Sequence, residues 1–100
     1  MLNVKKTFEN GVLTVVLEGR LDTNTSSLLE AELNSSLDGV IKLVFDFSGL
    51  TYISSSGLRI LLYAHKTMTV RGGEMTVRNV NDIIMDIFDV TGFSDILNIG

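Results

Sequence analysis

The chain opens with two short runs of strand-forming residues on either side of Asn10-Gly11. Apolar and polar residues alternate before this pair, and the mostly apolar run from Val12 to Leu17 follows it. Asn and Gly both tolerate a positive φ, which a two-residue type I′ turn requires at its two central positions. The pattern therefore predicts a β-hairpin whose strands cover about residues 3–9 and 12–18.

A first helix is predicted over roughly residues 25–37. The second strand ends at Gly19-Arg20-Leu21-Asp22, and residues whose side-chain oxygens can cap a helix follow it: Thr23, Asn24 and Thr25. Apolar residues then recur at four-residue steps, which is one stripe of a helix: Leu29, Leu33 and Leu37. Asp38-Gly39 ends the pattern.

The most hydrophobic segment is Val40 to Phe47, interrupted only by Lys42 and Asp46. Such continuous apolarity is typical of a strand that is covered on both faces, as strands of parallel sheets usually are. The next residues, 48–56, are mostly small and polar. They are predicted to form a loop.

A helical period returns at Gly57. One predicted face carries small and apolar residues, namely Gly57, Ile60, Leu61, Ala64 and Met68. Another carries polar and aromatic ones: Arg59, Tyr63 and Lys66. Arg71-Gly72-Gly73 turns the chain, and a short strand is expected over residues 74–77.

The last helix shows the clearest apolar period, at Val80, Ile83, Ile84, Ile87 and Phe88. Asn79 or Asn81 can cap it, Thr91-Gly92 can end it, and residues 96–99 are predicted as a final strand. Three carboxylates share one face of this helix: Asp82, Asp86 and Asp89. Such a stripe is either a solvated face or a docking surface for a basic partner.

The resulting order is β-β-α-β-α-β-α-β. Strands that alternate with helices indicate an α/β fold with a mixed, mostly parallel sheet, to which the opening hairpin adds one antiparallel edge. We therefore expect four to five strands, three to four packed helices, and one folding unit over residues 1–100.

Composition narrows the possible functions. The 100 residues carry a net charge of −4, which suits neither nucleic acid nor an anionic membrane surface. The chain has no Cys and one histidine, His65, and it lacks the glycine-rich phosphate and dinucleotide loops. We expect a cytoplasmic protein without a cofactor, without enzymatic activity and without membrane insertion.

The chemically informative segment is Asp46 to Leu62, which runs from a predicted strand through a serine-rich loop into a helix. Unpaired N–H groups at a helix start, together with the positive end of the helix dipole, favour an anion placed there. Serines are also good N-caps and need no further function. Residue chemistry alone leaves both interpretations open.

The run Asp46-Phe47-Ser48, followed by Ser54-Ser55-Ser56-Gly57-Leu58, resembles the signature of the STAS domain, the family of bacterial anti-sigma factor antagonists. That signature has an Asp, an apolar residue and a Ser, followed by Asp-Ser-Ser-Gly-Leu. Gly19-Arg20-Leu21-Asp22 resembles the family's Gly-x-Leu-Asp loop. The resemblance extends along all 100 residues and implies a single STAS domain with the STAS fold.

The resemblance implies a phosphorylation switch. In the family, the middle Ser of the Asp-Ser-Ser-Gly run accepts a phosphoryl group from an anti-sigma factor that is also a serine kinase, and a serine phosphatase resets the switch. The matching residue is Ser55, with Ser54 and Ser56 as the other candidates, and Ser54 stands where the family often has Asp. The expected partner-binding residues are Asp22, Thr23, Asp46, Ser54, Ser56, Gly57 and Arg59.

Two other functions are compatible with the sequence. A STAS subunit that is not phosphorylated could dock on the cytosolic ATPase of a membrane transporter, with Arg59, Tyr63 and Lys66 as candidate contacts. A small serine hydrolase is the third hypothesis. It lacks a base, because His65 lies roughly 15 Å along the helix from Ser55 at 1.5 Å per residue.

Overall fold

The computed structural model describes residues 1–100 and confirms the predicted order of strands and helices. The elements are β1 (Leu2–Glu9), β2 (Val12–Leu21), α1 (Thr23–Asn34), β3 (Lys42–Ile53), α2 (Ser55–Val70), β4 (Glu74–Arg78), α3 (Asp82–Thr91), the 3₁₀ helix η1 (Phe93–Asp95) and β5 (Asn98–Ile99).

The five strands form one sheet in the order β1-β2-β3-β4-β5. β1 pairs antiparallel with β2, and every other neighbouring pair is parallel. Asn10 and Gly11 have φ angles of 52° and 79°, both in the left-handed region that a type I′ turn requires. The predicted hairpin and the predicted α/β fold class are therefore confirmed.

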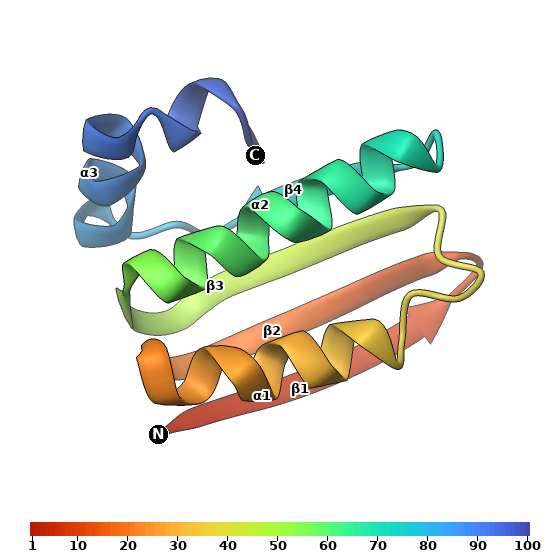
Figure 1. Ribbon diagram of the computed structural model, residues 1–100, viewed down its shortest axis with the longest axis horizontal. Coiled ribbons are helices and arrows are strands. Elements are labelled where there is room, and N and C mark those ends of the chain that lie inside the picture. Colours follow the sequence, from red (N-terminus) through yellow and green to blue (C-terminus); the bar gives the residue numbers. More distant parts are fainter.

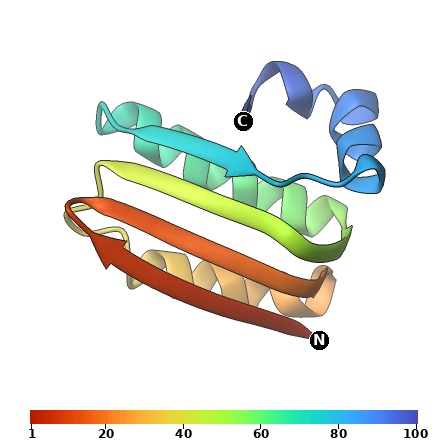
Figure 2. The same ribbon diagram turned by 180° about the vertical axis from the view of Figure 1, so that it is seen from behind.

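α1 and α2 lie side by side on one face of the sheet, and the strands lie in front of them in the reverse view (Figures 1 and 2). The expectation that β3 is covered on both faces is therefore wrong. Leu43, Phe45 and Phe47 are fully buried in the core, whereas Lys42 and Asp46 alternate with them and are only half-buried. The strand thus shows the alternation of a sheet with one open face.

β3 is longer than predicted, because it continues through Ile53 instead of giving way to a loop after Phe47. Residues Gly49 to Ile53 stay paired with the end of β2, from Glu18 to Leu21, across two irregularities in the register. Thr51, Tyr52 and Ile53 are residue types that favour strands, and pairing with β2 carries the strand past Ser48 and Gly49, which do not. The predicted loop shrinks to Ser54.

Other boundaries also differ from those predicted. α1 begins at Thr23 because Asp22 is its N-cap, not one of the three residues that follow, and it ends at Asn34. Of the two predicted caps of α3, Asn81 is the one that caps it, and Gly92 ends that helix in the left-handed conformation, as predicted. The last strand contains only Asn98 and Ile99, since residues 93–95 form a 3₁₀ turn.

α2 presents the two faces that its sequence predicts. The residues that pack on the sheet are buried, namely Gly57, Ile60, Leu61, Ala64 and Met68. Arg59, Tyr63 and Lys66 are exposed. Neither α2 nor any other helix here combines the length and the hydropathy that crossing a membrane demands.

Candidate functional site

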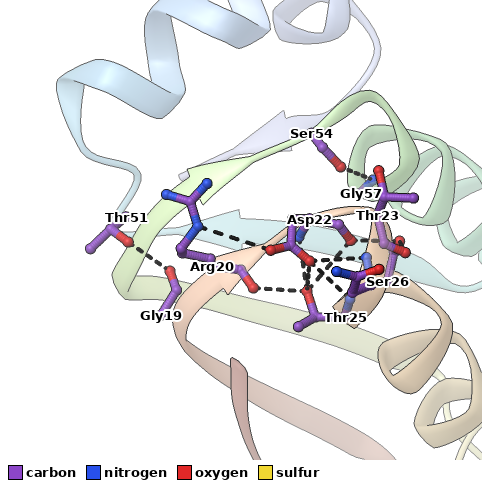
Figure 3. A network of polar contacts seen from close by, with 10 residues as sticks. Gly19, Arg20, Asp22, Thr23, Thr25, Ser26, Thr51, Ser54 and Gly57 are labelled. Carbon is purple, nitrogen blue, oxygen red and sulfur yellow. Dashed lines mark hydrogen bonds and ion pairs between the residues drawn. The ribbon is translucent and has the colours of Figure 1, made fainter. Parts of the chain in front are cut away.

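The candidate site lies at the edge of the sheet where β2 and β3 end and α1 and α2 begin (Figure 3). Two hydrogen bonds hold the two strand ends together there. The Ser54 N–H donates to the Leu21 carbonyl oxygen at 2.9 Å, and the Thr51 hydroxyl donates to the Gly19 carbonyl oxygen at 2.9 Å. The starts of both helices therefore have fixed positions relative to each other.

The three consecutive serines have different environments. Ser54 is the N-cap of α2, and its Oγ accepts a hydrogen bond from the Gly57 N–H at 3.3 Å. Ser56 is half-buried, whereas Ser55, the first residue of the helix, is exposed. No hydrogen bond within the chain engages the Ser55 hydroxyl, which therefore differs from the capping Ser54 hydroxyl.

Gly57 allows α2 to approach the sheet closely. A Cβ atom at this position would lie 2.8 Å from Leu21 Cγ and 2.9 Å from Ile53 Cγ1, and both of those side chains are buried in the core. Gly57 is itself buried. Gly57 therefore lets the N-terminus of α2 pack against β2 and β3, and its expected contact with a partner stays a prediction.

We expect Gly57→Val to lower the free energy of unfolding by about 2 kcal/mol, since added methyl groups would have to displace packed core side chains. Gly57→Ala should cost less, because alanine gains about 1 kcal/mol of helix propensity over glycine. Urea denaturation of the three proteins measures both differences. A Gly57→Val protein as stable as the parent would contradict this packing role.

Asp22 anchors the start of α1. Its carboxylate accepts hydrogen bonds from the N–H groups of Asn24 and Thr25, each at 3.0 Å, and the Thr25 hydroxyl accepts one from the Asp22 N–H at 2.8 Å. The bond from the Thr25 N–H is the main cause that holds the pKa of Asp22 below its ordinary value. Asp22 thus combines a capping box with an ionised carboxylate at the edge that carries Ser55.

Arg20 and Tyr52 form a contact that the sequence analysis misses. They pair across β2 and β3, and the Arg20 guanidinium lies 4.2 Å from the centre of the Tyr52 ring, which is a cation–π arrangement. Arg20 Nε also lies 3.9 Å from the Asp22 carboxylate. Because two register irregularities precede this pair, no spacing in the sequence could have indicated it.

Asp46 has a separate set of polar partners. Its carboxylate accepts hydrogen bonds from the Ser48 N–H at 2.9 Å and from the Asn79 side chain at 3.1 Å, and Arg78 lies 4.0 Å away. The Ser48 N–H is the main cause that lowers the pKa of Asp46. Asp46 therefore connects β3 with the segment between β4 and α3, and its carboxylate has no hydrogen bond to Ser55.

The lowered pKa values predict how stability depends on pH. Both carboxylates are held ionised in the folded chain, so their stabilising contribution is present above the ordinary pKa of 3.8 and is lost as the pH falls through the folded values. We expect urea midpoints to be level from pH 7 to about 5 and to fall below about pH 4. Asp46→Asn should make the decline shallower, and Asp38→Asn, at an exposed turn, should leave it unchanged. An equally steep acid decline in Asp46→Asn would contradict this assignment.

The sequence model of the STAS domain matches residues 3–100. The chain belongs to the STAS domain family. BtrV of Bordetella bronchiseptica is 33% identical over 88 residues, covering 87% of this chain and 76% of that protein. The anti-sigma F factor antagonist of Paenibacillus polymyxa is 30% identical over 100 residues, covering 98% of this chain and 86% of that protein.

Solved structures share the fold of this STAS domain. The Bacillus cell fate determinant SpoIIAA in its phosphorylated form matches with a TM-score of 0.76 and 16% identity, over 100% of this chain and 91% of that chain. The predicted STAS fold is thus confirmed. On this STAS domain Asp22, Thr23 and Ser54 to Ser56 lie at one edge, and the exposed Arg59 follows on the first turns of α2.

Proposed function

We propose that this STAS domain is an anti-sigma factor antagonist: its unmodified form binds an anti-sigma factor, and phosphorylation of Ser55 ends that binding. The observation that carries the proposal is the exposed Ser55 hydroxyl at the start of α2, within the family's serine motif. Membership of the family and the name of the Paenibacillus relative support the choice of partner.

The proposed contact surface surrounds Ser55 and consists of exposed and half-buried residues from two helix starts: Asp22, Thr23, Ser54, Ser56 and Arg59. Arg20 and Tyr52 extend it along the ends of β2 and β3. Asp46 is left out because its carboxylate is occupied by Ser48 and Asn79. Gly57 is left out because it is buried.

The switch follows from charge. The Ser55 Oγ would attack the γ-phosphorus of ATP bound by the partner kinase, the bond to the leaving ADP would break, and the hydroxyl proton would pass to a base of the kinase. The free chain tolerates the new phosphate, of charge about −1.5 to −2, because the first N–H groups of α2 and the helix dipole favour an anion.

A closely packed interface does not tolerate the same phosphate. Binding would require its desolvation, and the carboxylate of Asp22 lies on the same edge. Since each 1.4 kcal/mol is a tenfold change in affinity, a loss of a few kcal/mol separates the partners. Hydrolysis of the phosphoserine by a phosphatase would restore binding.

Release of a sigma factor tests this function. The unmodified chain is added to a purified complex of a sigma factor with its anti-sigma factor kinase from the same genome, and the products are separated by size-exclusion chromatography. We expect free sigma factor and a new complex of the chain with the kinase, and no release once the chain is phosphorylated. A complex that persists in excess unmodified chain, for every such kinase of the genome, would overturn the proposal.

A further inference from the structure

The net charge of the chain is confined to its last segment. The twelve acidic and eight basic residues give a net charge of −4, and all eight basic residues lie at or before Arg78, together with eight of the acidic ones. The remaining four acidic residues belong to α3 and the 3₁₀ turn after it: Asp82, Asp86, Asp89 and Asp95. Residues 1–78 therefore carry no net charge, and the C-terminal segment carries the whole net charge of −4.

The outward face of α3 combines these carboxylates with exposed apolar side chains. Ile83 is 65% exposed and Val90 is 87% exposed, although a large apolar residue on a short helix usually faces the core. At about 100° per residue, Ile83 and Val90 form one row, and Asp82, Asp86 and Asp89 form the row beside it. Ile84 and Phe88 on the opposite side are fully buried.

This arrangement costs the free chain stability. Asp82 and Asp86 are four residues apart and Asp86 and Asp89 three, so like charges are neighbours on the helix surface. Asp89 lies in the last turn, where the helix dipole disfavours an anion, and that turn contains no basic residue. None of these carboxylates has a salt bridge, since the four ion pairs of the chain involve other residues.

α3 stands at the end of the molecule that carries Ser55. Both views place it at the end of the sheet where α1 and α2 begin (Figures 1 and 2). The Asn81 side chain, at the cap of α3, donates to the Leu50 carbonyl oxygen near the end of β3 at 2.8 Å. A partner seated on the Ser55 edge therefore has α3 beside it.

We propose that the face formed by Asp82, Ile83, Asp86, Asp89 and Val90 docks an amphipathic helix of a partner protein, in which a row of apolar residues is flanked by Lys or Arg. The apolar row would cover Ile83 and Val90, and the cations would pair with the three carboxylates. The assignment of that helix to the anti-sigma factor rests on the proposed function. The docking surface itself does not.

A titration with a model helix tests the surface without any anti-sigma factor. A synthetic 18-residue helical peptide of Leu and Lys is added to the ¹⁵N-labelled chain, with a matched Leu and Glu peptide as the control ligand. We expect amide shifts to concentrate on residues 82–91 with the Lys peptide alone and to shrink as salt is raised. Shifts centred on another face, or equal effects of both peptides, would overturn the proposal.

Variants separate a specific surface from attraction by net charge. Replacing Asp82, Asp86 and Asp89 by Asn, or Ile83 and Val90 by Ser, should weaken peptide binding about tenfold. The charge-matched control replaces the exposed Glu9, Glu30 and Glu74 by Gln. Its affinity for the Lys peptide should differ from that of the parent by less than about twofold. Asp89→Asn alone should also unfold at a higher urea concentration than the parent, because it removes an anion from the last turn of α3. Equal weakening by both triple variants would contradict the proposal.

Size-exclusion chromatography of the chain alone tests whether a second copy of the chain, and not a partner's helix, covers this face of α3. We expect one elution volume for the parent chain and for the Asp-to-Asn variant. Association of the parent that the variant abolishes would identify a second copy as the occupant and overturn the assignment to a partner's helix. The sigma-factor release experiment does not depend on the peptide titration. A failed titration would overturn the docking surface on α3 and leave the proposed function standing, and a failed release would do the reverse.

Discussion

Ser55→Asp is expected to weaken binding of the anti-sigma factor by about a hundredfold or more, equivalent to about 2.7 kcal/mol. The carboxylate would place a fixed negative charge at the exposed start of α2, on the same edge as ionised Asp22. An interface that covers this edge must desolvate the added charge, whereas the free chain gains from the helix dipole. Ser55→Ala removes only a hydroxyl and should bind like the parent.

Isothermal titration of the anti-sigma factor with both variants measures this difference. The control is Ser35→Asp, which adds the same charge at the other end of α1, about 18 Å along that helix at 1.5 Å per residue, where the side chain is also exposed. The affinity of Ser35→Asp for the anti-sigma factor should stay within about twofold of the parent's. If Ser55→Asp binds as tightly as Ser55→Ala, charge at Ser55 does not control the interaction.

Phe47→Ala is expected to lower the free energy of unfolding by about 3–5 kcal/mol. The Phe47 side chain is fully buried, and its ring lies 6.0 Å from that of Phe45 and 6.3 Å from that of Phe88. These rings connect β3 with α3, so their removal opens a cavity beneath the helix that carries the acidic face. A loss of this size is a large part of the 5–15 kcal/mol that stabilises an ordinary domain.

Urea denaturation followed by circular dichroism measures the loss. Phe8→Ala is the matched control, because Phe8 is 56% exposed and its truncation removes the same atoms from a largely solvated position. We expect less than about 1 kcal/mol for the control. Equal losses in the two variants would show that the aromatic cluster does not form the core between β3 and α3.

The fold was predictable where one local signal decided each element. Asn10-Gly11 specifies its own turn, and the apolar period of α2 matches its buried face. The apolar period of α3 is only partly right, because Ile84 and Phe88 are buried whereas Ile83 is 65% exposed. The prediction of cover on both faces of β3 failed for an instructive reason. Val44 lies on the open face of the sheet, between Lys42 and Asp46, and yet it is apolar and buried. An apolar residue at this position makes the segment continuously apolar and hides the alternation between core-facing and open-face residues.

The boundaries that were missed depend on geometry that residue preferences alone do not show. β3 extends to Ile53 because β2 offers it a paired neighbour, and the shifted register of that pairing cannot be deduced from the residues of the segment itself. Asp22 rather than Thr23 caps α1 because its carboxylate reaches two N–H groups at once. Both are tertiary or short-range geometric effects that outweigh residue preference.

For the site, the sequence supplied the candidate residues and the structure distinguished among them. The motif could not rank Ser54, Ser55 and Ser56 by environment, whereas the fold makes Ser54 a cap and leaves Ser55 exposed. Asp46 looked equivalent to Asp22 in the sequence, yet it faces Asn79 and Arg78. A role for Arg20 and Tyr52 needed the register of two strands.

Intact-mass analysis tests whether Ser55 is the phosphorylated residue. The chain is incubated with ATP and the anti-sigma factor kinase of its genome, weighed intact, and then fragmented to locate the modification. We expect one added phosphoryl group, on Ser55, and none in Ser55→Ala. A phosphoryl group on Ser54 or Ser56, stoichiometric uptake by Ser55→Ala, or no uptake with any such kinase would contradict it.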